Sequence, residues 1–202
     1  DILNAKSNNF LAALHKTPKG FGVAFLDVST GEFLCAQGSE EYIDKLLQNF
    51  SPSEVLISKP ERKNIQASFG PSWHYFYMED WVFQEDYALE TLTQHFNTKT
   101  LAGFGVGHLQ LGIVAAGVAL HYLNETRHNK LSHINRLNRI AEDAYVWMDR
   151  FTIKNLELFQ SAAPDGVSLL EVIDKTTTPM GGRLLKRWLA LPLKELSAIQ
   201  AR

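Results

Sequence analysis

FGVAFLDVSTGEFLCAQ, residues 21–37, alternates strand-forming and turn-forming residues in a way that sets the fold class. Two apolar runs, residues 21–28 and 32–37, flank a Ser-Thr-Gly sequence that is typical of a tight turn. A third apolar run, residues 10–14, comes before them and is followed by a Thr-Pro-Lys-Gly connector. Such short connectors join antiparallel strands, because parallel neighbours need a crossover of about a dozen residues. The first third of the chain is therefore predicted to be an antiparallel meander.

Helical and extended patterns alternate beyond this meander. The predicted elements are a helix over residues 40–50, strands over 55–58 and 73–78, and helices over 87–96 and 108–128. Gly112 and Gly117 lie inside the last helix, which is nearly apolar all round, and close packing on a sheet would explain them. A meander followed by such alternation predicts an α/β fold with a mixed sheet and flanking helices.

The pattern changes near residue 130, and we expect residues 1–131 and 132–202 to form separate segments. Short extended-looking pieces fill residues 132–148, and helical patterns follow at residues 152–159 and 168–173. Another helix begins at Thr178-Pro179, with Thr as N-cap and Pro at the first helical position, and Pro192 stops it. Its predicted apolar stripe contains Met180, Leu184, Leu185, Trp188 and Leu189, and its basic side contains Arg183, Lys186 and Arg187. A last helix is expected over residues 195–202.

Composition excludes several classes of protein. Lys+Arg number 20 and Asp+Glu 22, so the net charge of −2 argues against an autonomous DNA-binding domain. The single Cys35 excludes an intrachain disulfide and is expected to be a buried, inert thiol. No apolar run reaches the ~20 residues that a membrane-spanning helix needs. The first residue is Asp1 rather than Met, and we expect the chain to be part of a longer one.

Motifs for cofactors and catalysis are incomplete. The glycines of residues 103–107 lack the third glycine of a dinucleotide fingerprint, because that position is His108, and they are expected to form a turn into the long helix. The sequence contains neither a P-loop nor the GxSxG pattern of a serine nucleophile. Glu125, His128 and His133 lie close in sequence without metal-ligand spacing. We therefore predict no catalytic, cofactor-binding or metal-binding residue in this chain.

Asp27 leaves one enzymatic alternative open. A strand meander that ends in Asp27, just before a turn, is how a ribonuclease H-like nuclease begins, and such a nuclease binds two metals with several converging carboxylates. The other carboxylates lie beside loops without a clear pattern, and Asp27 can equally accept turn N–H bonds. A metal-dependent nuclease and a purely structural α/β domain remain the alternatives to an interaction module.

The sequence resembles a known family over nearly its whole length. The sequences MDRFTIKNLELF (residues 148–159) and SLLEVIDKTTTPMGGRLLKRWLALPL (residues 168–193) resemble the opening of the core domain of MutS-type DNA mismatch-repair proteins. GVAFLDVSTGEF (residues 22–33) and LAGFGV (residues 101–106) resemble two parts of the connector domain of that family. The family-motif residues are Asp27, Gly31, Gly103, Asn155, Glu157, Thr178, Pro179, Met180, Gly181, Arg183 and Trp188.

The resemblance implies a fold and a role. It implies a connector with a ribonuclease H-like α/β fold and no nuclease activity, followed by the truncated start of a helical core domain. The parent protein would recognise mismatched double-stranded DNA as a homodimer, hydrolyse ATP with Mg, and recruit a MutL-type partner in the bacterial cytosol, near the nucleoid. The connector would offer that partner one docking surface, although no pattern selects positions such as Glu90 and Thr91.

The same resemblance places other functions outside the chain. The mismatch-reading domain is expected before Asp1 and the nucleotide-binding domain well after Arg202, so this segment would neither read a mismatch nor hydrolyse ATP. Its role would be to join those two ends, with reorientation around residues 132–149. We also expect the apolar stripe of residues 179–191 to pack against core helices of the full protein, and to self-associate when those are missing.

Overall fold

A computed structural model describes residues 9–126 and 131–202, and these residues form two compact units. Residues 9–44 and 51–140 make an α/β unit, and residues 45–50 and 141–202 belong to a second unit. The predicted helix over residues 108–128 includes Arg127 and His128, which lie outside the described residues. In the part of the chain that is described, no helix is long and apolar enough to cross a membrane.

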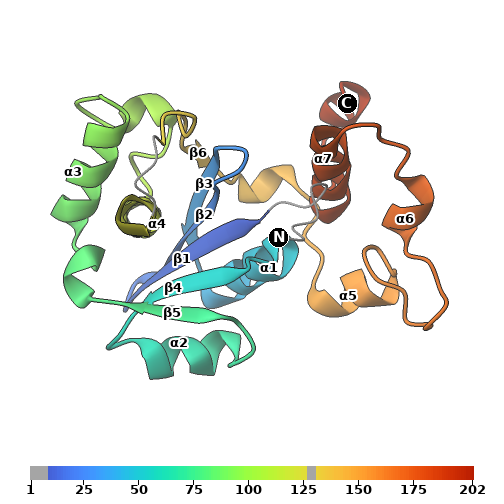
Figure 1. Ribbon diagram of the computed structural model, residues 1–202, viewed down its shortest axis with the longest axis horizontal. Helices are drawn as coiled ribbons and strands as arrows, with labels where there is room; N and C mark the ends of the chain where they lie inside the picture. Colours follow the sequence, from blue (N-terminus) through green and yellow to red (C-terminus); the bar gives the residue numbers. More distant parts are fainter. Residues whose placement is uncertain (1–8, 127–130) are drawn as a thin grey trace. The chain divides into compact units, whose positions relative to one another are not determined.

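A six-stranded mixed sheet in the order β5-β4-β1-β2-β3-β6 forms the centre of the α/β unit (Figure 1). The strands are β1 (Phe10–Thr17), β2 (Gly20–Asp27), β3 (Glu32–Gly38), β4 (Glu54–Ser58), β5 (Tyr75–Met78) and β6 (Asn138–Arg139). The pairs β1–β2 and β2–β3 are antiparallel, whereas β1–β4, β4–β5 and β3–β6 are parallel. Both the predicted meander and the predicted α/β class are confirmed.

The alternation of side chains along β2 explains how the sheet is covered. Gly22, Ala24 and Leu26 face α4 (Gln110–Thr126), and Gly22 lets the backbone of Leu111 approach so closely that a β-carbon would clash with it. Phe21 points to the other face, where its ring meets Phe69 of α2 (Arg62–Phe69) at a centroid distance of 5.1 Å. The sheet is thus buried on both faces, with α4 on one side and α2 on the other (Figure 1).

The glycines of α4 are explained by close packing, though not both by the sheet. A β-carbon at Gly112 would lie 2.9 Å from the carbonyl oxygen of Ala36 in β3, as predicted. A β-carbon at Gly117 would instead lie 2.5 Å from Cβ of Ala88, in α3 (Glu85–His95). Gly117 therefore serves the contact between two helices, which corrects the prediction that it packs on the sheet.

Three elements of the α/β unit differ from the prediction. Helix α2 was not predicted, because its sequence RKNIQASF lacks a regular apolar stripe and has no side-chain N-cap. The 3₁₀-helices η1 (Asp80–Phe83) and η2 (Ala102–Phe104) were also not predicted. Residues 132–140, expected to begin a junction, pack on the α/β unit: Ile134 and Leu137 are buried, and β6 pairs with β3.

Short helices make up most of the second unit. They are the last part of α1 (Glu40–Phe50), η3 (Glu142–Ala144), α5 (Arg150–Asn155), α6 (Leu169–Ile173), α7 (Pro179–Ala190) and α8 (Leu196–Gln200). Helix α5 ends at Asn155 rather than at the predicted residue 159, because Glu157 takes a left-handed backbone angle of φ 48°. The chain then crosses to α6, where Ser168 and Glu171 form a capping box.

Candidate functional sites

The turn after β2 holds the first two family-motif residues. The Asp27 carboxylate is fully buried, and its Oδ1 accepts hydrogen bonds from the backbone N–H (2.8 Å) and the hydroxyl (2.6 Å) of Ser29. Gly31 has φ 74°, and a β-carbon there would lie 2.5 Å from the carbonyl oxygen of His133. His133 Nε2 in turn lies 2.7 Å from the carbonyl oxygen of Val28. Asp27 and Gly31 thus shape a turn that fits against the 131–134 segment.

The carboxylates that a metal-dependent nuclease would need beside Asp27 instead pair with other side chains. The Ser58 hydroxyl donates to Oδ1 of Asp80 (2.7 Å), Lys59 pairs with Glu79, and the Tyr122 hydroxyl donates to Glu54 (3.2 Å). Within residues 9–126 and 131–202, no three His, Cys, Asp or Glu side chains gather where they could hold a metal ion. His128, one member of the sequence cluster with Glu125 and His133, lies outside the described residues.

Gly103 belongs to a loop that leads into α4. It lies in η2, and a β-carbon built on it would contact nothing within 4 Å. The left-handed residue of this loop is Gly105, with φ 70°. The glycine-rich sequence therefore makes the turn into the long helix, and Gly105 rather than Gly103 is the position where the backbone requires glycine.

Asn155 and Glu157 lie at the end of α5. Asn155 is exposed, whereas the Glu157 carboxylate accepts hydrogen bonds from the backbone N–H of Ala162 (3.0 Å) and the hydroxyl of Ser161 (3.3 Å). The carbonyl oxygen of Glu157 also accepts the N–H of Leu169 (2.9 Å). Glu157 thus organises the connection from α5 to α6.

The TPMG sequence begins α7 as a capped helix. Thr178 is the N-cap, with its hydroxyl oxygen accepting the N–H of Gly181 at 3.1 Å, and Pro179 occupies the first turn. A β-carbon at Gly181 would lie 3.2 Å from both Thr176 and Thr178. Met180 projects from the same turn with 72% of its side chain exposed.

The sides of α7 do not divide as the sequence predicts. Met180 and Leu184 of the apolar stripe are exposed, whereas the basic Arg183, Lys186 and Arg187 are partly buried. Burial lowers the pKa of Lys186, whose ammonium lies 5.7 Å from the ring centroid of Phe159. The pKa of Arg187 is also lowered, first by burial and then by the charge of Arg202. The basic side is partly buried because long basic side chains pack their aliphatic stems on neighbouring residues.

Trp188 lies on α7 near the C-terminal residue. Its partly buried ring faces the guanidinium of Arg202, whose Cζ lies 4.9 Å from the ring centroid. The family-motif residues therefore fall into distinct places: a turn and a loop in the α/β unit, and the ends and sides of short helices in the second unit. Asp27, Gly31, Glu157, Thr178 and Pro179 shape or cap a local element, whereas Asn155 and Met180 are exposed and Gly103 has open space around it.

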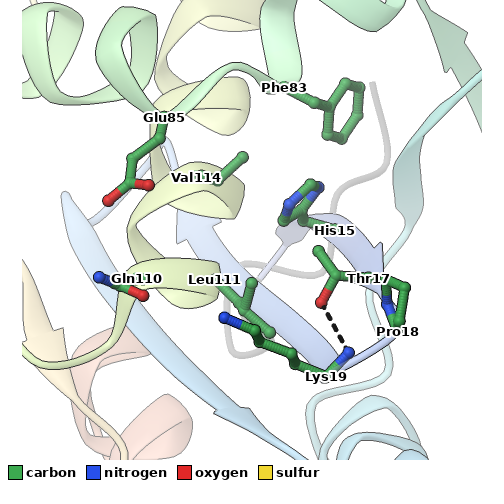
Figure 2. A pocket seen from close by; sticks show the side chains of 9 residues that line it. All are labelled: His15, Thr17, Pro18, Lys19, Phe83, Glu85, Gln110, Leu111 and Val114. Carbon is green, nitrogen blue, oxygen red and sulfur yellow. Dashed lines mark hydrogen bonds between the residues drawn. The ribbon is translucent and has the colours of Figure 1, made fainter.

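A cavity of about 300 Å³, which no sequence pattern indicated, opens beside the β1–β2 hairpin (Figure 2). His15 stacks on Phe83 with ring centroids 5.9 Å apart, and Leu111 and Val114 of α4 add apolar walls. Lys19, Glu85 and Gln110 supply its polar lining. Burial lowers the pKa of His15, and the charges of Asp80 and Glu61 oppose this effect. The residues that line the cavity come from segments far apart in the sequence, so no local pattern indicates it.

An aromatic surface is the second feature that sequence analysis missed. Trp81 of η1 lies edge-on to Tyr87 of α3 and to His121 of α4, with centroid distances of 5.0 and 5.4 Å. Tyr87 Oη and His121 Nδ1 lie 2.7 Å apart, within hydrogen-bond distance. Farther along α3, Glu90 is exposed and Thr91 is partly exposed, and the Glu90 carboxylate accepts a hydrogen bond from the Gln94 amide at 2.9 Å.

Comparison with known proteins yields two family matches. A family model described as MutS domain II matches residues 9–135, and one described as MutS domain III matches residues 151–202. Proteins named DNA mismatch repair protein MutS are 64% identical in Christiangramia forsetii, 61% in Flavobacterium psychrophilum and 52% in Parabacteroides distasonis. Each alignment covers all 202 residues of this chain but only 23% of the relative, so the chain spans about a quarter of their length.

Proposed function

The chain belongs to the MutS family, and from that premise we propose that it is a non-catalytic connector between other parts of a mismatch-repair protein. One observation carries this proposal: a single chain holds the sheet unit matched as MutS domain II, followed closely by a segment matched as MutS domain III. Only residues 136–150 separate the two matches. A change in the orientation of one unit would therefore be transmitted to the other through this short stretch and through α1, which has residues in both units.

The proposal extends to the whole protein. Its relatives are named for DNA mismatch repair, and the resemblance implies that the full protein binds mismatched double-stranded DNA as a homodimer. ATP and Mg would be bound by a part of the protein outside this chain. A MutL-type protein would be the partner, and the bacterial cytosol, with the nucleoid, would be the place of action. In this scheme, the present chain transmits a change between sites that lie outside it.

We place the point of reorientation at residues 141–149, within the segment 132–149 that the sequence suggested. Residues 131–140 are held to the sheet unit, since His95 Nε2 lies 2.7 Å from the carbonyl oxygen of Ile134, and Ile140 N–H donates to Cys35 (2.9 Å). Beyond them, the N–H of Val146 donates to the carbonyl of Pro192 (2.7 Å), which ties the next stretch to the second unit. The first residues after Ile140 are thus one place where the backbone can absorb a rotation, and α1, which has residues in both units, must bend or shift with it.

We further propose that the α/β unit docks a MutL-type protein. Helix α3 supports this, because residues such as Glu90 and Gln94 project from it while Ala88 and Leu92 are buried beneath. A side of a helix that is free of contacts within its own unit can be used by a partner without unfolding the sheet. Through this docking role, the partner would bind the α/β unit and respond to the conformation of the full protein.

A calorimetric titration of this chain with the MutL-type protein of the same organism, with nucleotide present, tests the docking role. We expect saturable binding that Glu90→Arg weakens, because the new charge enters the proposed contact. Lys175→Glu, on an exposed loop of the second unit, is a charge-reversal control and should leave the affinity unchanged. Absence of binding to the unmodified chain would contradict docking by this segment alone.

A further inference from the structure

Five aromatic side chains of η1, β5, α3 and the C-terminal part of α4 form two contacting groups, which the neighbouring residues His121 and Tyr122 of α4 join. Trp81, Tyr87 and His121 contact one another edge-on, as described above, and Tyr87 and His121 lie 5.6 Å apart. Phe76 of β5 packs on Tyr122 of α4, the residue next to His121, with centroids 5.1 Å apart. We call these five residues, Phe76, Trp81, Tyr87, His121 and Tyr122, the aromatic patch.

Two members of the aromatic patch are unusually exposed. Trp81 is 54% and Phe76 47% exposed, and they are the only large apolar side chains that are exposed among the described residues of the α/β unit. The rings beneath them are fixed, because Tyr87 and His121 lie within hydrogen-bond distance and the Tyr122 hydroxyl donates to Glu54. An exposed tryptophan on a rigid aromatic base has the composition and geometry of an interface anchor.

Acidic side chains predominate in the described sequence segments that carry the aromatic patch. Residues 64–98 contain the acids Glu79, Asp80, Glu85, Asp86 and Glu90 and no Lys or Arg. Residues 100–126 add Glu125 and likewise contain no Lys or Arg, and Arg127 and Lys130 lie outside the described residues. Among the described residues, Lys59 pairs with Glu79, Arg62 lies over the ring of Tyr77, and Asp80 accepts a hydrogen bond from Ser58. The exposed carboxylates of Asp86 and Glu125 remain beside Tyr87 and His121 in the chain.

His121 does not offset this negative charge. Burial lowers its pKa, and the charge of Glu125 only opposes that effect. The imidazole is therefore mainly neutral at pH 7 and leaves the surface acidic.

We propose that the aromatic patch is a docking surface for a cationic segment of a partner protein, with an Arg or Lys side chain placed over the exposed ring of Trp81. The electron-rich face of an indole attracts cations, and surrounding carboxylates strengthen the attraction and favour a basic partner. Phe76, packed on Tyr122, adds exposed apolar area to the aromatic patch. The inference goes beyond the proposed docking of a MutL-type protein, and it is tested without that protein.

Charge complementarity selects this occupant over two others. A second copy of the chain would bring like charges together if it docked through the same surface, as a symmetric dimer does. A nucleic acid would bring its phosphates against the carboxylates of residues 79–90 and 125, and the described residues 64–98 and 100–126 contain no Lys or Arg to attract them. A basic protein segment satisfies both the rings and the carboxylates.

The test is a titration of the 202-residue chain with hexa-arginine peptide at low and at physiological salt. Binding is followed through the indole N–H signals in nitrogen-15 NMR spectra, where the signal of Trp81 should shift and that of Trp147 should not. Trp81→Ala should weaken binding by at least about threefold, and Trp81→Phe, which keeps an aromatic face, by less. Thermal unfolding of both variants confirms that they are folded.

A charge-matched pair of double variants separates a site from general attraction. Asp86→Asn with Glu125→Gln should weaken peptide binding, whereas Asp165→Asn with Glu195→Gln, which removes the same charge from exposed positions of the second unit, should not. Equal weakening by both pairs, unchanged affinity in Trp81→Ala, or no saturable binding would each overturn the proposal. Sedimentation without peptide completes the test, because self-association that Trp81→Ala abolishes would assign the patch to a second copy instead.

Discussion

Asp27 is the residue at which a nuclease and a connector make opposite predictions. Its carboxylate is buried and accepts both Ser29 hydrogen bonds through Oδ1, so it serves the turn after β2. Asp27→Ala should lower the free energy of unfolding by about 1–3 kcal/mol, because the Ser29 donors lose their acceptor. Asp27→Asn should cost less, since an amide oxygen can still accept. Urea denaturation measures both values.

The same two variants address nuclease activity. We expect no cleavage of DNA or RNA by the chain in Mg²⁺ or Mn²⁺, and no change in Asp27→Asn. Metal-dependent cleavage that disappears in Asp27→Asn would contradict a purely structural role and would revive the ribonuclease H-like enzyme as the function of this chain.

His15 predicts how stability responds to pH. Burial lowers its pKa in the folded chain, so below its ordinary pKa of about 6.5 the unfolded chain binds a proton that the folded chain does not. The free energy of unfolding should therefore fall as the pH decreases from 7 to 5, and His121, whose pKa is also lowered by burial, adds to the loss. His15→Phe keeps a ring against Phe83 and should reduce the loss. An equal loss in both proteins, by urea denaturation, would exclude His15 as its cause.

At the scale of residues, contacts between positions close in the sequence could be predicted, and contacts between positions close only in space could not. The hydrogen bonds of Asp27 and Thr178 reach residues two or three positions away, so turn and capping chemistry indicates them. The aromatic patch joins residues 76–87 to residues 121 and 122, and no local pattern connects such segments. Its one signal in the sequence was the lack of Lys and Arg around Trp81, which becomes informative only once the rings are known to meet.

Helices and strands follow the same division. The hairpins β1–β2 and β2–β3 depend on short turns, and the sequence predicts them well. The predicted end of helix α5, at residue 159, was too late. The apolar spacing continues to that residue, but the left-handed backbone of Glu157 prevents the helix from continuing beyond Asn155. The basic side of α7 was expected opposite an apolar stripe, yet Arg183, Lys186 and Arg187 are partly buried, and the Lys186 ammonium lies over the ring of Phe159.

The packing of α3 on α4 gives a prediction at the scale of elements. In a helix interior, Gly→Ala ordinarily stabilises by about 1 kcal/mol, but at Gly117 the new β-carbon would lie 2.5 Å from Cβ of Ala88. Gly117→Ala should therefore lower the melting temperature. Adding Ala88→Gly removes the facing β-carbon and should restore part of the loss, beyond the sum of the two single changes. Additive losses would show that the two residues do not limit the approach of the helices.

Exposed apolar side chains set the behaviour of the whole molecule in solution. Residues 141–202 expose Phe151, Met180 and Leu196 by 75, 72 and 67%, and Leu184 by 47%. Apolar surface of this kind promotes association, so the chain should self-associate with rising concentration, and Met180→Gln with Leu184→Gln should reduce the effect. Sedimentation equilibrium measures it. A monomer at every concentration would refute the expectation.

The central claim is that two units of one chain reorient about the residues that follow Ile140. The unique native thiol, Cys35, is buried with its pKa raised to about 12, so spin labels will attach to introduced cysteines at exposed positions instead. Glu90→Cys with Ser197→Cys places one label in each unit, and Glu90→Cys with Lys63→Cys places both in the α/β unit as the matched control.

Pulsed electron spin resonance then gives the distribution of distances between the labels. We predict a broad distribution for the pair that spans the two units and a narrow one for the control pair. Equally narrow distributions for both pairs would show that the units form one rigid body, and would contradict the proposed reorientation about the residues that follow Ile140.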